Sequence, residues 1–305
     1  MKNNMLRSLF LALFLTLTLA ACQEERVSIA LADIEELMSQ GSAPSYKAAE
    51  KLAYDTLKKL KVDNRPAAIE ERRTVLRALI EIKLKFRQDP QAAVDLLKQL
   101  AAIAGPEERY RIKLNIVDLF ENELGLTTEA VFILHEIIAI AEEEGRADLD
   151  ANYYHLIKDL FALRKYEQCR EAVHQLSLKY PDSPYLVRSR LIEANSFFIQ
   201  EEYHKAIALH RALLDEPLTP EEQGTVYFEL GSSYQMLSEQ KEALNYYKLA
   251  LKGHKNPQMV QNHISYMQIL LDNANVEKQL KRSRLEQAYL ERASPENEHE
   301  MRLIR

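Results

Sequence analysis

The residues of this 305-residue chain that could do chemistry are few, and they do not combine into a catalytic motif. His135-Glu136 begins the H-E-x-x-H pattern of zinc proteases, but Ala139 stands in the place of the second metal-binding histidine. The sequence has no glycine-rich phosphate loop, no G-x-S-x-G nucleophile motif and no paired-cysteine metal motif. We therefore expect a protein that is not an enzyme and that holds no cofactor or metal.

Cys22 is the residue with the clearest chemical context. Lys2 and Arg7 precede an uncharged stretch over 8–21, which is typical of a secretory signal and shorter than the about 20 residues of a membrane-spanning helix. The stretch ends in Leu19-Ala20-Ala21-Cys22, which resembles the lipobox of bacterial lipoproteins. That resemblance implies a lipidated Cys22 as the mature N-terminus. The alternative is an ordinary secreted protein with a chance cysteine after the cleavage site.

The residues after Cys22 suggest where the chain is anchored. The resemblance implies several acyl chains on Cys22, and more than one chain gives stable membrane attachment. Gln23 follows the cysteine, where an aspartate would favour retention at the inner membrane of a Gram-negative host. We expect the periplasmic face of the outer membrane. The tether over 23–26 spans at most about 14 Å, so the folded part should lie close to that membrane.

The composition predicts an all-α protein. Leu, Ala, Glu, Lys and Gln, which are good helix formers, dominate, whereas glycine occurs only 7 times. The formal net charge is −6, and a protein that binds nucleic acid needs a basic face. We therefore expect protein or peptide partners and no nucleic acid.

Small residues recur with a period of 37 residues. Ala243, Ala206 and Cys169 are spaced by 37, and so are Ala130 and Ala93, with two extra residues between the two sets. A small side chain is needed where the two helices of a hairpin approach closely. By this register Cys169 is a buried packing residue and not a reactive thiol.

The clearest motif combines these positions with aromatic residues. It reads Tyr227-x2-Leu230-Gly231-x2-Tyr234, followed by Ala243-x3-Tyr247 and Ala250. It resembles the tetratricopeptide repeat (TPR) signature, W-x2-L-G-x2-Y and then A-x3-F, with tyrosine replacing tryptophan and phenylalanine. The joint over 179–184 is similar to the joints between repeats of periplasmic TPR lipoproteins that assemble outer-membrane proteins. The resemblance implies a right-handed superhelical solenoid that serves as a docking surface.

We divide the chain accordingly. Residues 1–21 are the lipoprotein signal peptide, and 22–26 are the lipidated end and its tether. About six TPR-like helix hairpins follow over 27–254, with turns expected near 41–44, 89–90 and 125. Residues 255–293 should form two C-terminal capping helices, and 294–305 a disordered tail.

The resemblance also assigns a binding groove. In TPR arrays the first helix of each hairpin lines the concave face at fixed positions. Transferring these positions to the last three hairpins gives Tyr154, Lys158, Phe161, Arg188, Asn195, Phe198, Phe228, Ser232 and Gln235. Rings beside amide, hydroxyl or ammonium groups suit a bound peptide. The alternative is that the rings pack against the neighbouring hairpin and never face solvent.

Two functions are compatible with these features. The first is a membrane-anchored adaptor or scaffold that holds protein partners of a bacterial cell-envelope assembly. The second is an accessory protein that binds a glycan or cell-wall fragment on its tyrosine-rich surface, since the chain has 15 tyrosines. The sequence leaves the oligomeric state open.

Overall fold

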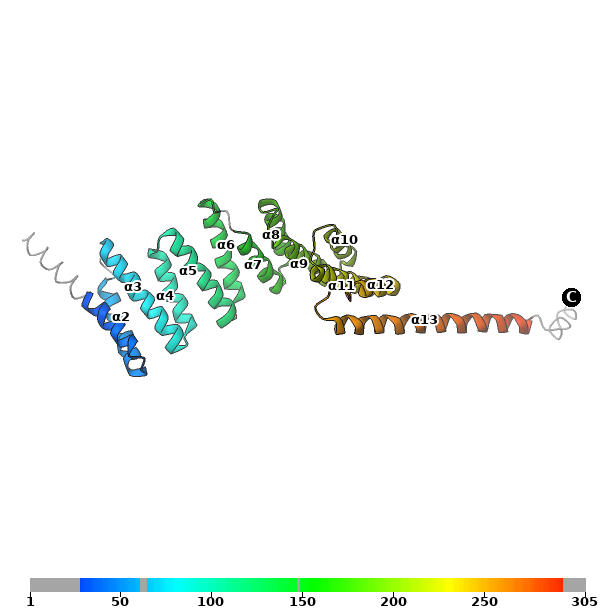
Figure 1. The fold of residues 1–305 in the computed structure, drawn as a ribbon, viewed down its shortest axis with the longest axis horizontal. Helices are drawn as coiled ribbons and strands as arrows, with labels where there is room; N and C mark the ends of the chain where they lie inside the picture. The colour runs from blue at the N-terminus through cyan, green and yellow to red at the C-terminus, as the bar shows by residue number, and fades with distance from the viewer. Residues whose placement is uncertain (1–27, 61–64, 147–148, 293–305) are drawn as a thin grey trace, which may run out of the picture. The chain divides into compact units, whose positions relative to one another are not determined.

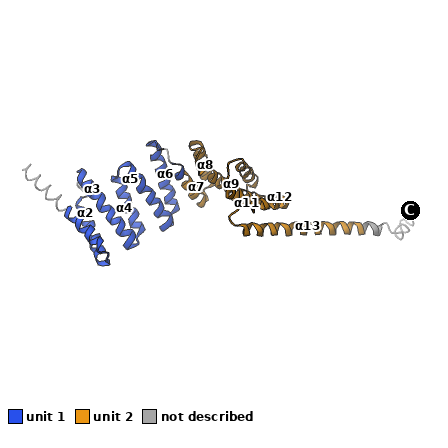
Figure 2. Cartoon of the chain, in the orientation of Figure 1, with its two compact units in different colours: residues 1–152 blue, residues 153–305 orange. Residues whose placement is uncertain are grey.

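The computed structural model describes residues 28–60, 65–146 and 149–292, and side chains in the last helix as far as Gln287. All regular structure in this part of the chain is helical (Figure 1). The expected all-α fold is confirmed. The chain divides into two compact units, residues 1–152 and residues 153–305 (Figure 2).

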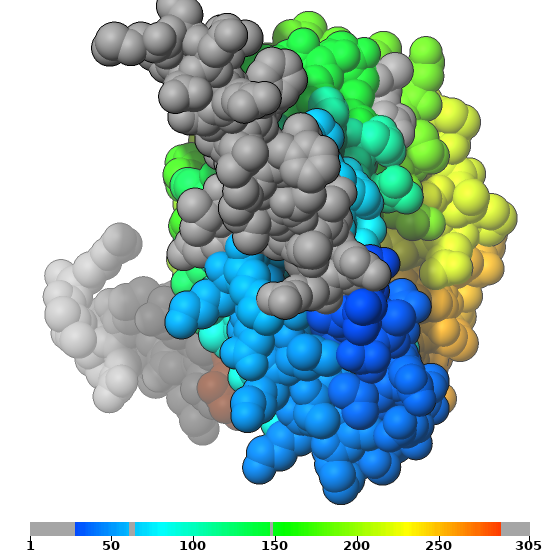
Figure 3. All heavy atoms as spheres, turned by 90° about the vertical axis from the view of Figure 1, so that its left-hand side faces the viewer, coloured from blue at the N-terminus to red at the C-terminus, as the bar shows by residue number. Residues whose placement is uncertain are grey.

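Unit 1 consists of helices that pack against their neighbours in chain order. After a helical segment over 28–39 come α2 (Ala43–Leu60), α3 (Pro66–Ile82) with its π-helical extension η1 (Lys83–Arg87), α4 (Pro90–Ile103), α5 (Pro106–Asp118) with its extension η2 (Leu119–Glu123), and α6 (Thr127–Glu143). In the view from the N-terminal end, α2 and α3 lie next to each other (Figure 3). The expected turns at 41–44, 89–90 and 125 separate these helices.

The helix ends of unit 1 follow from the local sequence. Pro66, Pro90 and Pro106 stand at the first helical turn, where a missing N–H costs nothing. The Asp89 carboxylate accepts a hydrogen bond of 3.0 Å from the backbone N–H of Ala92 and so caps α4. These signals explain why the hairpin boundaries could be predicted.

Unit 2 continues the same hairpin pattern and adds one long helix. Its helices are α7 (Asp150–Ala162), whose first three residues belong to unit 1, α8 (Tyr166–Lys179), α9 (Leu186–Ile199), α10 (Tyr203–Leu213), α11 (Pro220–Met236), α12 (Gln240–Ala250) and α13 (Pro257–Arg292). Thr219 and Glu222 form a reciprocal capping box at the start of α11.

The hairpin turns reproduce the 37-residue period in their backbone angles. Arg164, Glu201 and Ser238 have positive φ values of 58°, 62° and 60°, and each stands 37 residues from the next. Gln88 and Gly125, also 37 apart, have φ values of 48° and 65°. A left-handed residue therefore ends the first helix of five hairpins, including four where that residue is not glycine.

The small residues of the predicted register are all fully buried. Ala93, Ala130, Cys169, Ala206 and Ala243 have an exposed fraction of 0%. The Cys169 thiol lies 3.5 Å from the backbone carbonyl oxygen of Ile157, in the first helix of its hairpin. Burial raises the pKa of this thiol to about 12. The prediction that Cys169 is buried is confirmed.

The C-terminal region forms one helix where we expected two. Helix α13 runs without interruption over 36 residues. Between 258 and 292 the sequence has no glycine or proline to break it, so the polar stretch over 272–275 stays helical. The predicted signal peptide, the lipidated end and the C-terminal tail lie outside the described residues. Among the described residues, none of the helices combines the length and the hydrophobicity that a membrane span requires.

Candidate functional site

The predicted groove residues all lie on the first helices of hairpins in unit 2, but their surroundings differ. On α7, Lys158 is exposed and its ammonium lies 5.9 Å from the ring centre of Tyr154. Tyr154 in turn stacks on Tyr185, with ring centres 5.1 Å apart. On α9, the Arg188 side chain is 60% exposed, and its Nε atom lies 3.7 Å from a carboxylate oxygen of Glu222. These residues remain accessible to a partner.

The two rings that recur in the predicted pattern pack inside their own hairpins. Phe161 meets Tyr166 edge-on at 5.8 Å, and Phe198 meets Tyr203 edge-on at 5.4 Å. Tyr166 and Tyr203 each begin the second helix of the hairpin. The partial burial of both phenylalanines agrees with the packing alternative.

The Asn195 side chain already contacts a buried histidine. Its side-chain oxygen lies 3.2 Å from Nε2 of His210, which is fully buried. Burial lowers the pKa of His210 to about 4, so the imidazole is neutral at physiological pH. Asn195 thus satisfies a core residue, and this contact limits its use for a partner.

The groove residues of α11 belong to an internal network, which we call the aromatic cluster. Phe228 lies within 5.0–5.4 Å, ring centre to ring centre, of Tyr247, His254 and His263. The Tyr247 hydroxyl donates a hydrogen bond of 2.7 Å to the Gln235 side chain. It also lies 3.3 Å from the hydroxyl of Ser232. Nearby, burial raises the pKa of Glu229 to about 7.

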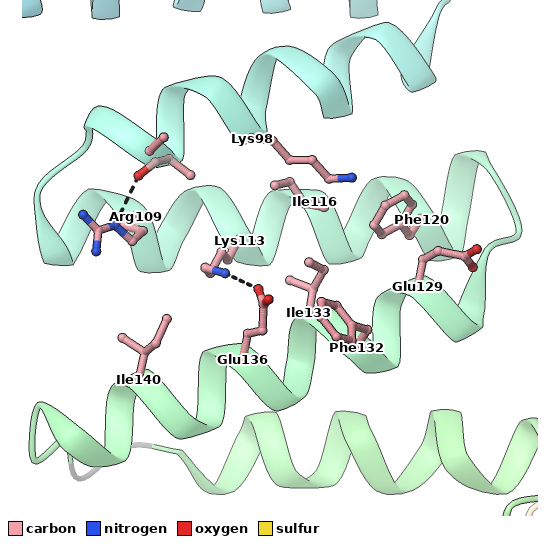
Figure 4. A pocket seen from close by; sticks show the side chains of 12 residues that line it. Lys98, Arg109, Lys113, Ile116, Phe120, Glu129, Phe132, Ile133, Glu136 and Ile140 are labelled. Atoms are coloured by element: carbon pink, nitrogen blue, oxygen red, sulfur yellow. Dashed lines mark hydrogen bonds and ion pairs between the residues drawn. The ribbon is translucent and has the colours of Figure 1, made fainter.

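Unit 1 has an open groove that the sequence analysis did not identify. We call it the apolar groove; α4 and α6 form its walls and α5 its floor, and its volume is about 650 Å³ (Figure 4). Its lining residues are Lys98, Ala101, Ala102, Arg109, Lys113, Ile116, Phe120, Glu129, Phe132, Ile133, Glu136 and Ile140. Phe132 is 63% exposed and presents its ring to the groove.

The charged side chains of the apolar groove are mostly held in place. Lys113 forms an ion pair with Glu136, the carboxylate of the incomplete zinc-type motif. Arg109 donates to the backbone carbonyls of Ala101 and Ala104, at 3.1 and 3.0 Å, and so completes the end of α4. These contacts fix the groove walls and leave its apolar surface free for a ligand.

A second groove of unit 1 lies between the first helices α3 and α5, on the side where TPR arrays are expected to bind. We call it the charged groove, and its volume is about 870 Å³. Arg77 and Arg73 both bind the Glu108 carboxylate, the Arg77 contact measuring 2.6 Å. These hydrogen bonds, Arg77 first, lower the pKa of Glu108. The polar lining is thus largely neutralised internally.

A sequence signal for the apolar groove exists in α6. Its run Ala130-Val131-Phe132-Ile133-Leu134 places apolar residues on every side of the helix. A helix that is apolar all round needs a neighbour on each side. Within unit 1, α5 packs against α6 and leaves Phe132 uncovered.

Comparison of the sequence with known protein families and with curated proteins gives no match. Solved structures do match. The apo form of RapI aligns over 81% of this chain and 73% of its own, with 14% identity and a TM-score of 0.55. A Podosopora anserina putative kinesin light chain with nearly identical TPR-like repeats covers 61% of this chain and 94% of its own, with 20% identity and a TM-score of 0.44. A MamA RS-1 double mutant covers 59% and 92%, with 17% identity and a TM-score of 0.44.

The helix hairpins, their 37-residue register and their buried small residues define the class of fold. The chain folds as a TPR-like array of helix hairpins, as the sequence motif predicted. At these identities the likeness concerns the fold alone.

Proposed function

We propose that this chain is a membrane-anchored adaptor that holds protein partners of a bacterial cell-envelope assembly. The TPR-like fold supports the adaptor part, because a stack of hairpins offers long surfaces between its helices. The lipobox-like sequence before Cys22 supports the anchor and a place at the periplasmic face of the outer membrane.

The apolar groove is the observation that carries the proposal. Its lining extends along α6 from Glu129 to Ile140, which is about 17 Å or three helical turns. Two helices with a third between them as floor form a trough of the shape that accepts a helix. We assign it an amphipathic helix of a partner protein, with Phe132 contacting the apolar face of that helix.

An exposed charge in the apolar groove indicates which charge the partner helix should carry. The Lys98 ammonium stands 5.5 Å from the ring centre of Phe120 and forms no ion pair with the described residues. A partner helix with an acidic residue beside its apolar face would satisfy this charge. Tyr154, Lys158 and Arg188 in unit 2 supply a second accessible surface for the same partner or another one.

The glycan-binding alternative receives less support. Sugars stack on free ring faces, whereas Phe161, Phe198 and Phe228 of the predicted groove pack against rings of the chain itself. Tyr234 and Tyr246 likewise stack on each other, with ring centres 5.4 Å apart.

Co-purification tests the proposed function. The chain, tagged at its C-terminus so that Cys22 stays free, is isolated from detergent-solubilised envelopes. We expect a fixed stoichiometric set of envelope proteins, and Cys22→Ser should move the chain out of the membrane fraction. If the chain, expressed at its native level, were recovered without partners, the adaptor role would be wrong. If the Cys22→Ser variant stayed in the membrane fraction, the lipid anchor would be wrong.

A further inference from the structure

We infer that the chain forms a dimer in which α13 pairs antiparallel with α13 of a second copy. This inference does not depend on the proposed function. Helix α13 carries two largely apolar stripes that point in opposite directions, and among the described residues one of them packs against the hairpins while the other stays exposed.

The first stripe holds α13 against its own hairpins. Val260, Ile264 and Met267 are buried and Leu271 is partly buried, all in the core cluster of unit 2. The second, which we call the outward stripe, consists of Tyr266, Ile269, Asn273, Val276 and Leu280. At 100° per residue, the mean directions of the two stripes differ by about 190°.

The outward stripe is exposed along its whole length. Tyr266 and Ile269 are 51% and 57% exposed, although they lie on the half of α13 that packs on the repeats. Val276 and Leu280 are each 53% exposed on the projecting half, where every described residue over 272–287 is exposed. A helix without tertiary packing is marginal in water, so this half needs a partner.

The spacing of the outward stripe is that of a coiled coil. Tyr266, Asn273 and Leu280 occupy a positions of a heptad repeat, and Ile269 and Val276 occupy d positions. Continued in both directions, the seam runs from Asn262 to Gln287, which is 26 residues. This length is between three and four heptads, or about 39 Å.

Antiparallel pairing centred between residues 274 and 275 makes this seam self-complementary. Ile269 then faces Leu280 of the second copy, and Tyr266 faces Ser283 of the second copy. The Tyr266 hydroxyl therefore faces the Ser283 hydroxyl. At the ends of the seam, the Asn262 amide faces the Gln287 amide. The two Asn273 side chains lie about 4.5 Å apart along the axis, close enough to hydrogen-bond across it. The polar positions near the ends of the seam are thereby matched, whereas Asn273 faces Val276 of the second copy in the same register.

The flanking charges favour this direction over the parallel one. In a parallel pair, Asp272 at g would stand beside Glu277 at e of the second copy, twice per dimer, and like charges repel. In the antiparallel pair, Asp272 stands beside Gln279 of the second copy instead. The second copy is therefore the occupant that the stripe fits.

The mass of the full chain in detergent micelles tests the dimer, by sedimentation equilibrium at micromolar concentration. We expect two copies per particle for the native chain and one for Val276→Glu/Leu280→Glu. The control is Ala274→Glu/Leu285→Glu, which adds the same charge at exposed sites on the other side of α13 and should stay dimeric. A monomeric native chain, or equal masses for both variants, would overturn the inference. Circular dichroism verifies that both variants keep their helix content.

Disulfide formation tests the direction. Mixing Ile269→Cys chains with Leu280→Cys chains should give a cross-linked heterodimer within minutes of mild oxidation, because these residues face each other. Asn262→Cys alone, about 37 Å from its own copy along the axis, should not cross-link with itself. Efficient self-linking of Asn262→Cys would show parallel pairing and overturn the antiparallel arrangement.

Discussion

The hairpin α11–α12 and the hairpin α5–α6 follow the same plan but leave different surfaces. In α11–α12, a Cβ atom added to Gly231 would lie 2.7 Å from the ring of Tyr247, so that ring occupies the space above the glycine. In α5–α6, Phe132 faces the apolar groove, and Ala101 and Ala102 of the preceding helix line the opposite wall. Aromatic packing onto glycine closes the first surface, whereas the second keeps an open groove.

This difference suggests where each part of the chain is specialised. Tight packing with saturated hydrogen bonds, as in the aromatic cluster, stabilises the repeat and offers few free groups. An uncovered apolar trough lowers stability and is retained where a partner covers it. By this comparison the proposed principal binding surface lies in unit 1.

The largest effect is expected from filling a close approach in the closed hairpin. A Cβ atom at Gly224 would lie 2.3 Å from the backbone nitrogen of His254, which cannot move without shifting the chain. Gly224→Ala should lower the free energy of unfolding by about 3 kcal/mol, measured by urea denaturation. Gly105→Ala in unit 1, where nothing lies within 4 Å, should change it by less than about 1 kcal/mol. Equal losses at both sites would remove the contrast between the hairpins.

The next effect concerns the buried carboxyl group of α11. The pKa of Glu229 is about 7 in the folded chain against an ordinary value of 4.5, so stability falls as the pH rises through this interval. Glu229→Gln should therefore raise the free energy of unfolding by about 3 kcal/mol at pH 8 and leave it nearly unchanged near pH 4.5. His210 has the opposite effect. Because burial lowers its pKa to about 4, the folded chain loses stability as the pH falls below 6.5. A pH-independent effect of the glutamine would refute the burial of this group.

The smallest effect is expected on the accessible surface of unit 2. Charge reversal of Lys158 and Arg188 together should weaken partner capture a few-fold and leave the unfolding curve unchanged, because both side chains are exposed. The effect should shrink in high salt. Unchanged capture at low salt would confine binding to unit 1 and sharpen the comparison.

Much of the fold could be predicted from the sequence. Small residues at Ala93, Ala130, Cys169, Ala206 and Ala243 fixed the register, since helices can approach closely only there. Proline and aspartate near the hairpin turns located the boundaries. The continuous helix α13 was missed because the polar stretch over 272–275 has the composition of a turn but no residue that breaks a helix.

The binding surface was harder to predict than the fold. The register places Ser232 and Gln235 on the first-helix face, but it cannot show that the Tyr247 hydroxyl reaches across to both. Nor does it show which face of an apolar helix such as α6 stays uncovered, because that depends on the neighbouring helices. Tertiary contacts, and not local pattern, decide these points.

A quantitative pull-down with Phe132→Asp shows whether the apolar groove binds a partner. The control is Leu178→Asp on α8, an equally exposed apolar site at 68% exposure against 63% for Phe132. If the groove binds a partner, Phe132→Asp should lower recovery of the envelope partners at least about tenfold, a loss of about 1.4 kcal/mol. Recovery with Leu178→Asp, and the unfolding curves of both variants, should stay at the native values. Native recovery with Phe132→Asp would show that the apolar groove does not bind these partners.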